Sequence, residues 1–156
     1  MSTPRPPATG WQLRDLPPGD AAWDAGAFEV LRQLRGHLDR DGFDRLHRAA
    51  VPQGLRFTAI FGPDGACLGV AGWRVMDTTN MMRKLYVDDL VVDDDARSGG
   101  VGSALLDHLV DRARTLGCHS LELDSGHQRV DAHRFYLREG LTDASRHFVV
   151  HLDADG

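Results

Sequence analysis

The sequence predicts a mixed α/β domain built around one sheet, and three observations carry this prediction. Two β-rich runs joined by the turn Gly62-Pro63-Asp64-Gly65 indicate a hairpin in the middle of the chain. A β-branched run from Leu85 to Val92 then meets a glycine cluster and passes into a helical repeat. A second apolar strand follows that helix. Because a helix crosses between these two strands, they must lie parallel.

The first half of the chain predicts one short strand, two helices and the hairpin. Residues 1–10 are rich in proline, so we expect a flexible tail ahead of a single domain spanning 11–156. Asp20 follows a Pro-Pro-Gly stop and can cap the first helix. Strand alternation, helical spacing and turn residues then place a strand, two helices and two hairpin strands, in that order, at 11–16, 21–38, 43–51, 55–61 and 66–76.

The second half alternates strands and helices. After a reversal over 77–80, the pattern predicts a strand, a helix, a strand, a helix and a last strand. Gly117 and Gly140 stop the two helices. These five elements are expected at 85–92, 103–116, 118–124, 129–139 and 147–152.

Size, charge and cysteine content restrict the kind of protein. The chain has 156 residues, 42% of them hydrophobic, which is enough for one core and too short for two domains of usual size. Its net charge of −5 argues against a nucleic-acid-binding face. No run approaches the length of a membrane span, and the first residues lack a signal peptide's apolar segment. We therefore expect a cytoplasmic protein with no membrane partner and with Cys67 and Cys118 as reduced thiols.

The glycine cluster is a candidate anion site. The first turn of a helix has backbone N–H groups without intrahelical acceptors, and its dipole places partial positive charge there. Glycines in that turn allow positive φ and let a diphosphate approach the main chain. The residues expected to hold it are Arg97, Ser98, Gly99, Gly100, Val101, Gly102 and Ser103.

Two other phosphate-binding loops do not fit this spacing. A P-loop requires a lysine at the helix start, where this chain has Gly102-Ser103-Ala104. A dinucleotide fingerprint requires a third glycine at position 105, where Leu105 stands. The turn is therefore expected to bind a different phosphate-bearing ligand.

Two motifs stand in a fixed order in the second half of the chain. The first is Arg97-x-x-Gly100-x-Gly102 behind a strand ending in Leu-Val-Val, and the second is Ala132-His133-Arg134-Phe135-Tyr136 followed by Gly140-Leu141. Together, at this separation, they resemble the GCN5-related N-acetyltransferase (GNAT) family, and the first resembles its acetyl-CoA-binding motif. The resemblance covers roughly residues 85–152. Within the family, the sequence looks like a bacterial branch whose members generally lack assigned substrates. One departure is Arg129, where many members have asparagine.

The resemblance implies a fold, a cosubstrate and an activity. The fold would be a mixed, mostly antiparallel sheet with a splayed central parallel strand pair flanked by helices. The pantetheine arm of acetyl-CoA would enter that gap and bond the backbone of Leu90, Val91 and Val92. The chain would then be an acyltransferase that moves an acetyl group directly to a primary amine. Tyr136 stands where the family commonly places a tyrosine beside the thioester sulfur, so it would act as the general acid.

The general base is left open among three carboxylates. Asp124 ends the second parallel strand and is expected to face the crevice between the two strands, so it is the first candidate. Asp88 and Asp89 are alternatives on the facing strand. Their opposite parity predicts that only one of them points into the cleft.

Other features leave the acceptor and the assembly open. The eight histidines show no zinc-site spacing, so no metal is expected. A small amine, an aminoglycoside, an amino acid or a protein N-terminus would each fit as acceptor. Homodimerisation rests on analogy with the fold type alone. The alternative function is a non-catalytic acyl-CoA sensor or interaction domain that kept the turn and lost turnover.

Overall fold

The computed structural model describes residues 10–153. Their contacts gather into two compact units, Met1–Leu123 and Asp124–Gly156, each of which is described by itself. The predicted flexible tail lies outside the described residues except for Gly10, and the single-domain organisation stays a prediction.

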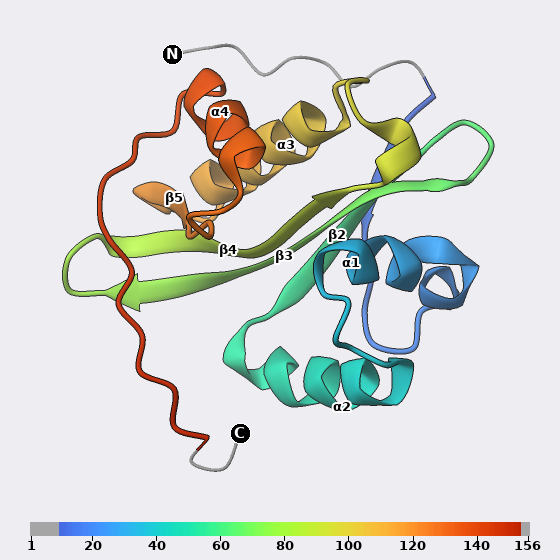
Figure 1. Cartoon of the computed structure of the whole chain (residues 1–156), viewed down its shortest axis with the longest axis horizontal. Helices are drawn as coiled ribbons and strands as arrows, with labels where there is room; N and C mark the ends of the chain where they lie inside the picture. Colours follow the sequence, from blue (N-terminus) through green and yellow to red (C-terminus); the bar gives the residue numbers. More distant parts are fainter. Residues whose placement is uncertain (1–9, 154–156) are drawn as a thin grey trace. The chain divides into compact units, whose positions relative to one another are not determined.

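The first unit contains a five-stranded sheet in the order β1-β2-β3-β4-β5. Neighbouring strands are antiparallel except β4 and β5, which are parallel (Figure 1). The predicted hairpin is therefore confirmed as β2 and β3, and the predicted parallel pair as β4 and β5. The strands β1 to β5 span Gln12–Asp15, Arg56–Phe61, Cys67–Thr78, Met82–Val92 and Ser120–Leu123.

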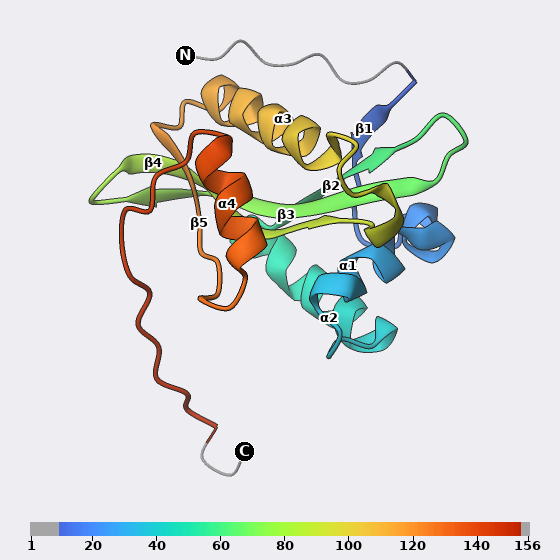
Figure 2. The ribbon, with the colours of Figure 1, turned by 45° about the horizontal axis from the view of Figure 1, so that its top comes forward.

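Helices α1 (Phe28–Leu34) and α2 (Arg40–Ala50) cover one face of this sheet (Figure 2). The core on this face is an aromatic cluster. The Trp23 ring lies 4.7 Å from that of Phe43 and 5.2 Å from that of Phe57, centroid to centroid, both in edge-on geometry. Such pairs add specific ring contacts to the hydrophobic gain of burial. The cluster thereby fixes α2 against β2.

Helix α3 (Val101–Thr115) packs on the opposite face. Its fully buried Leu105 and Leu109 belong to the same core as Trp73 of β3. The Trp73 indole N–H donates to the Thr58 hydroxyl at 3.0 Å, and that hydroxyl donates to an Asp15 carboxylate oxygen at 2.7 Å. These two hydrogen bonds give the buried indole N–H its acceptor and connect three neighbouring strands, β3, β2 and β1.

The first predicted helix is shorter and less regular than the spacing indicated. The predicted segment 21–38 begins as an irregular turn, η1 (Trp23–Ala27), because Gly26 has a non-helical φ of 131°. The regular helix ends at Leu34, and Arg35 leaves it with φ −118° and ψ 59°. Apolar spacing continues past this point because Leu38 still packs on the core, although its backbone is no longer helical.

Other boundaries shift by a few residues. Helix α2 begins three residues earlier than predicted, since Asp39 caps it by accepting the Gly42 N–H at 2.7 Å. Strand β4 starts at Met82, and β5 is trimmed at both ends. These differences leave the predicted order of elements intact up to β5.

The second unit contains helix α4 (Val130–Arg138), which confirms the predicted helix. The last predicted strand, 147–152, is wrong: these residues carry no secondary structure and are exposed. The side chains of Phe148 and Leu152 are 86% and 85% exposed. A β-rich composition supplies only a local preference, and a strand also needs a partner edge, which no described residue provides.

We predict that His47 makes the fold acid-sensitive. Burial among Trp23, Phe43 and Phe57 lowers the pKa of His47, so folding favours its neutral form. The unfolded chain takes up a proton below about pH 6.5, so stability falls as the pH drops through that value. Melting temperature measured between pH 8 and pH 5 should decline for the wild type and decline less for His47→Phe. Identical slopes would contradict the assignment. His108, whose pKa burial also lowers, contributes to the slope that remains in the variant.

Candidate functional site

The first turn of α3 presents uncapped backbone donors. The first intrahelical bond runs from the Ala104 N–H to the Gly100 carbonyl at 3.0 Å. The amides of Val101 and Gly102 precede that bond, and no side chain caps the helix. Gly100 has φ 88°, a left-handed conformation that glycine adopts without strain. The turn therefore offers several N–H groups and the positive end of a 15-residue helix dipole.

The residues before Gly100 shape the entrance to this turn. Ser98 also has a positive φ, 68°, which costs energy for a residue with a side chain. Arg97 pairs with Asp94 at 2.8 Å, and both side chains are exposed. The sequence suggested Arg97 as a fixed cation beside an anion. Its guanidinium forms an exposed ion pair of the weak kind with a neighbouring carboxylate, and its contact with an anion stays a prediction.

A bulge in β4 separates the two parallel strands. Asp89 pairs with Gly72, and Val87 pairs with Trp73, so Asp88 is an extra residue in β4. The pairing of β4 with β5 ends at Val87, opposite Leu123. Among the described strands, residues 89–92 therefore pair with β3 alone. This stretch contains Leu90, Val91 and Val92, whose open edge leads directly toward the α3 turn.

The bulge brings two carboxylates to the same face of the sheet. Gly72 and Arg74 lie two apart on β3, so both face α1 and α2. The Arg74 guanidinium donates to both Asp88 oxygens, at 2.9 and 3.2 Å. Asp89 accepts from Arg35 Nε at 2.7 Å. The parity argument, which allowed only one carboxylate on this side, assumed a regular strand, and the bulge removes that alternation.

Burial and pairing act in opposite directions on Asp89. Its side chain is only 14% exposed, and burial raises its pKa above the ordinary value, whereas the Arg35 guanidinium lowers it. The burial effect is the larger. Asp89 therefore holds a proton more readily than an exposed aspartate does.

Helix α1 is tied to the segment between β4 and the α3 turn. Gln33 donates from its side-chain amide to Asp93 at 2.7 Å and accepts the Asp94 N–H at 2.9 Å. Two residues further on, Arg35 donates to Asp89 and also to the Asp88 carbonyl, the latter at 3.0 Å. The end of α1 thus positions both ends of the open β4 edge.

Arg35 and Arg74 are site residues that sequence reasoning did not single out. Arg74 interrupts the apolar run of β3, and that interruption was the available signal. Arg35 stood inside a segment that the apolar spacing assigned to a helix, so its departure from that helix could not be foreseen.

The second unit contains Asp124 and Tyr136. The His147 Nδ1 lies 3.8 Å from an Asp124 carboxylate oxygen. Tyr136 is buried, and burial raises the pKa of its phenol. A hydrogen bond from Arg129, together with its charge, acts in the opposite direction. Arg129, the residue that departs from the family pattern, therefore contacts the candidate acid directly.

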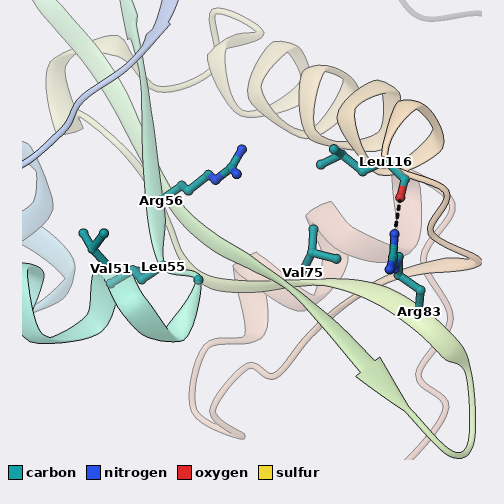
Figure 3. A pocket seen from close by; sticks show the side chains of 7 residues that line it. Val51, Leu55, Arg56, Val75, Arg83 and Leu116 are labelled. Carbon is teal, nitrogen blue, oxygen red and sulfur yellow. Dashed lines mark hydrogen bonds between the residues drawn. The ribbon is translucent and has the colours of Figure 1, made fainter.

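A separate hollow lies at the other end of α3. Figure 3 shows Val75, Arg56 and the last turn of α3 around it, with Arg83 donating to the Leu116 carbonyl at 3.2 Å. Its volume is about 360 Å³. None of the residues expected to hold a cofactor lines it. The lining consists of Val51, Gly54, Leu55, Arg56, Val75, Arg83 and Leu116.

Three further observations concern the chemistry available in residues 10–153. No three His, Cys, Asp or Glu side chains in this part of the chain gather in a way that could hold a metal ion. None of its helices is long and apolar enough to cross a bilayer. Burial raises the pKa of Cys67 to about 11, so its thiol is a poor nucleophile at neutral pH.

Comparisons with known proteins agree with this geometry. The family model described as the acetyltransferase (GNAT) family matches residues 22–141. An uncharacterized N-acetyltransferase, YhdJ, of Bacillus subtilis strain 168 is 32% identical over 113 residues, which cover 72% of this chain and 79% of the relative.

Two further proteins are similar over different extents. The aminoalkylphosphonate N-acetyltransferase of Salmonella typhimurium is 40% identical over 63 residues, covering 40% of this chain and 41% of that protein. The crystal structure of glucosamine-6-phosphate N-acetyltransferase from Arabidopsis thaliana superimposes with a TM-score of 0.72 at 22% identity. That superposition covers 92% of this chain and 99% of the other, and it shows a common fold.

We predict that Gly72→Ala destabilises the fold at the bulge. An added Cβ would lie 2.7 Å from the Phe57 ring and 2.8 Å from an Asp89 oxygen, and the ring is held in the core. Overpacking of this kind costs about 1–3 kcal/mol in the free energy of unfolding, measurable with urea. Gly36→Ala is the control, since its added Cβ would lie 3.6 Å from the Arg32 carbonyl oxygen, an ordinary van der Waals distance. Equal stability of the two variants would contradict this view of the bulge.

Proposed function

The chain belongs to the acetyltransferase (GNAT) family and is an acetyl-CoA-dependent acyltransferase, and on that premise we propose direct transfer of the acetyl group to a primary amine. One observation carries the proposal: the uncapped first turn of α3 follows the open edge of β4 in the chain, after the short helical turn Asp94–Ala96. An anion site and a free strand edge are thereby joined in one continuous stretch of backbone.

The residues present fit acetyl-CoA. Backbone amides in the first turn of α3 suit a diphosphate, because they supply donors and partial positive charge without a competing side-chain cap. The main chain of Leu90, Val91 and Val92 suits an amide-bearing arm, which can add to the open edge as a strand would. When bound, acetyl-CoA supplies an activated acetyl thioester.

Backbone groups of the open β4 edge would assist the transfer. An N–H of Val91 or Val92 on the open edge can donate to a carbonyl oxygen and stabilise charge that develops there. Such donors are held by the sheet and need no rearrangement. Removing one donor of this kind typically costs enzymes about two to three orders of magnitude in rate.

A carboxylate would take the proton of the amine, and Asp124 is our first candidate. Asp88 is a weaker one, since both of its carboxylate oxygens already accept hydrogen bonds from Arg74. Asp89 is the better of the two alternatives, because burial raises its pKa.

Tyr136 would protonate the departing thiolate. Its raised pKa keeps the phenol protonated at neutral pH, which is the form that can donate. The hydrogen bond from Arg129 supports the phenolate that results.

The proposal specifies the amine acceptor, the cellular compartment and the oligomeric state only in outline. The name of the Salmonella relative suggests aminoalkylphosphonates among the amines to test. A cytoplasmic location and a homodimer stay predictions.

We predict that Gly100→Asp weakens acetyl-CoA binding without unfolding the protein. Aspartate tolerates a left-handed backbone, but its charge would repel a diphosphate at the α3 turn. The dissociation constant measured by calorimetry should rise at least about tenfold, the loss of one charge-assisted interaction. Gly117→Asp is the matched control: Gly117 has a similar φ, 75°, just beyond the other end of the same helix. A wild type that binds no acetyl-CoA, or a Gly100→Asp variant that binds normally, would refute the site.

We predict that Tyr136→Phe lowers turnover and spares binding. Loss of a general acid should reduce kcat by about one to two orders of magnitude, with little change in acetyl-CoA affinity. Release of free thiol with a panel of amines measures kcat, and calorimetry measures the affinity for acetyl-CoA. Unchanged turnover would remove Tyr136 from the mechanism. Acetyl-CoA binding without thiol release from any amine in the wild type would favour a non-catalytic acyl-CoA sensor.

A further inference from the structure

We infer that the acceptor is a small amine that carries its own oxyanion group, a carboxylate or a phosphonate, and that Arg35 and Arg74 bind that group. The inference rests on the proposed function. It concerns the face of the bulge covered by α1 and α2, where two arginines meet two aspartates.

The position of these side chains places them next to the transfer reaction. The open edge of β4 ends at Val92, close before the α3 turn, and begins at the Asp88 bulge, where β5 rejoins it. A donor held at the turn and extended along this edge has its reactive end at the bulge. An amine that approaches from the α1 and α2 face therefore meets Arg35 and Arg74.

The two guanidinium groups have donor capacity left over. Arg74 uses Nε and Nη2 on Asp88, and Arg35 uses Nε on Asp89 and Nη2 on the Asp88 carbonyl. Neither Nη1 atom has a hydrogen-bond partner among the described residues. The Arg35 side chain is 42% exposed and that of Arg74 is 22% exposed, so both are accessible. Planar guanidinium forks suit carboxylate and phosphonate oxygens.

The pairing also favours an anionic group over a second cation. Both carboxylates are already engaged by arginine, so an acceptor with an additional ammonium would have to displace a guanidinium from its partner. An oxyanion can add to the free Nη1 donors and leave both ion pairs intact. The arginines are held in place before the acceptor arrives, which reduces the ordering cost of binding.

The competing explanation is that these pairs only fasten α1 to β4. Under that explanation, loss of Arg74 lowers stability and impairs every acceptor equally. Under our proposal, its loss selectively impairs acceptors with an oxyanion. The two explanations differ in a ratio of rates, which a general structural defect does not change.

The test compares three matched amines: propylamine, β-alanine and 2-aminoethylphosphonate. They share an amine and a short chain and differ in ending with a methyl, a carboxylate or a phosphonate group. Thiol release gives kcat/KM for each, at equal concentrations of free amine. We expect both oxyanion-bearing amines to exceed propylamine by at least about tenfold, the scale of one charge-assisted hydrogen bond. The ratio between carboxylate and phosphonate identifies the group that the site prefers.

Variants then locate the effect. Arg74→Gln should lower kcat/KM for the oxyanion-bearing amines by about 10- to 100-fold, mainly through KM, and change propylamine little. Arg74→Lys should recover part of the loss. Arg32→Gln is the control, because Arg32 lies on α1, is as exposed as Arg35, and contacts Glu29 and the Gly36 carbonyl rather than the bulge. Melting curves confirm that each variant is folded.

The outcomes separate the inference from the function on which it rests. An equal fall for all three amines in Arg74→Gln, or a wild-type preference for propylamine, overturns the inference while acetyl transfer stands. Acetyl-CoA binding without release to any of the three overturns the inference too. Absence of acetyl-CoA binding overturns the proposed function itself.

Discussion

The structure depends on one extra residue in β4. Because Asp88 has no counterpart in β3, the strand bends where it leaves β5, and the backbone beyond it stays open on one side. A regular strand would have continued its ladder with β5 and left no place for an extended ligand. The same insertion brings Asp88 and Asp89 to one face.

Packing on both sides of the sheet holds this irregularity in place. Trp73, next to the bulge, packs in the core beneath α3, and its indole N–H donates to Thr58 of β2. Gly72 faces the other way, where its missing Cβ leaves room for the Phe57 ring and Asp89. Since both neighbours of the bulge are fixed in dense cores, the kink in β4 cannot slide along the strand.

Much of the fold and half of the candidate site could be predicted from local pattern. The hairpin, the parallel pair and the glycine turn were predictable because turn residues and periodicity act over a few positions. The absence of a strand at 147–152 could not be predicted in this way. These residues have strand-like composition, but pairing requires a partner edge elsewhere in the fold. The parity argument for Asp88 and Asp89 failed for a related reason, since it assumed a ladder without a bulge.

The sequence by itself determined the order of elements, the uncapped helix start after Gly100 and the motifs that identify the family, because each depends on neighbours in the chain. Only the tertiary structure decided the charge pattern beside the open strand. Arg35 and Asp89 are 54 positions apart, and Arg74 reaches Asp88 across the sheet. Such contacts follow from strand register and from where a helix ends. Those features are set by packing of the whole core, which no short stretch of sequence specifies.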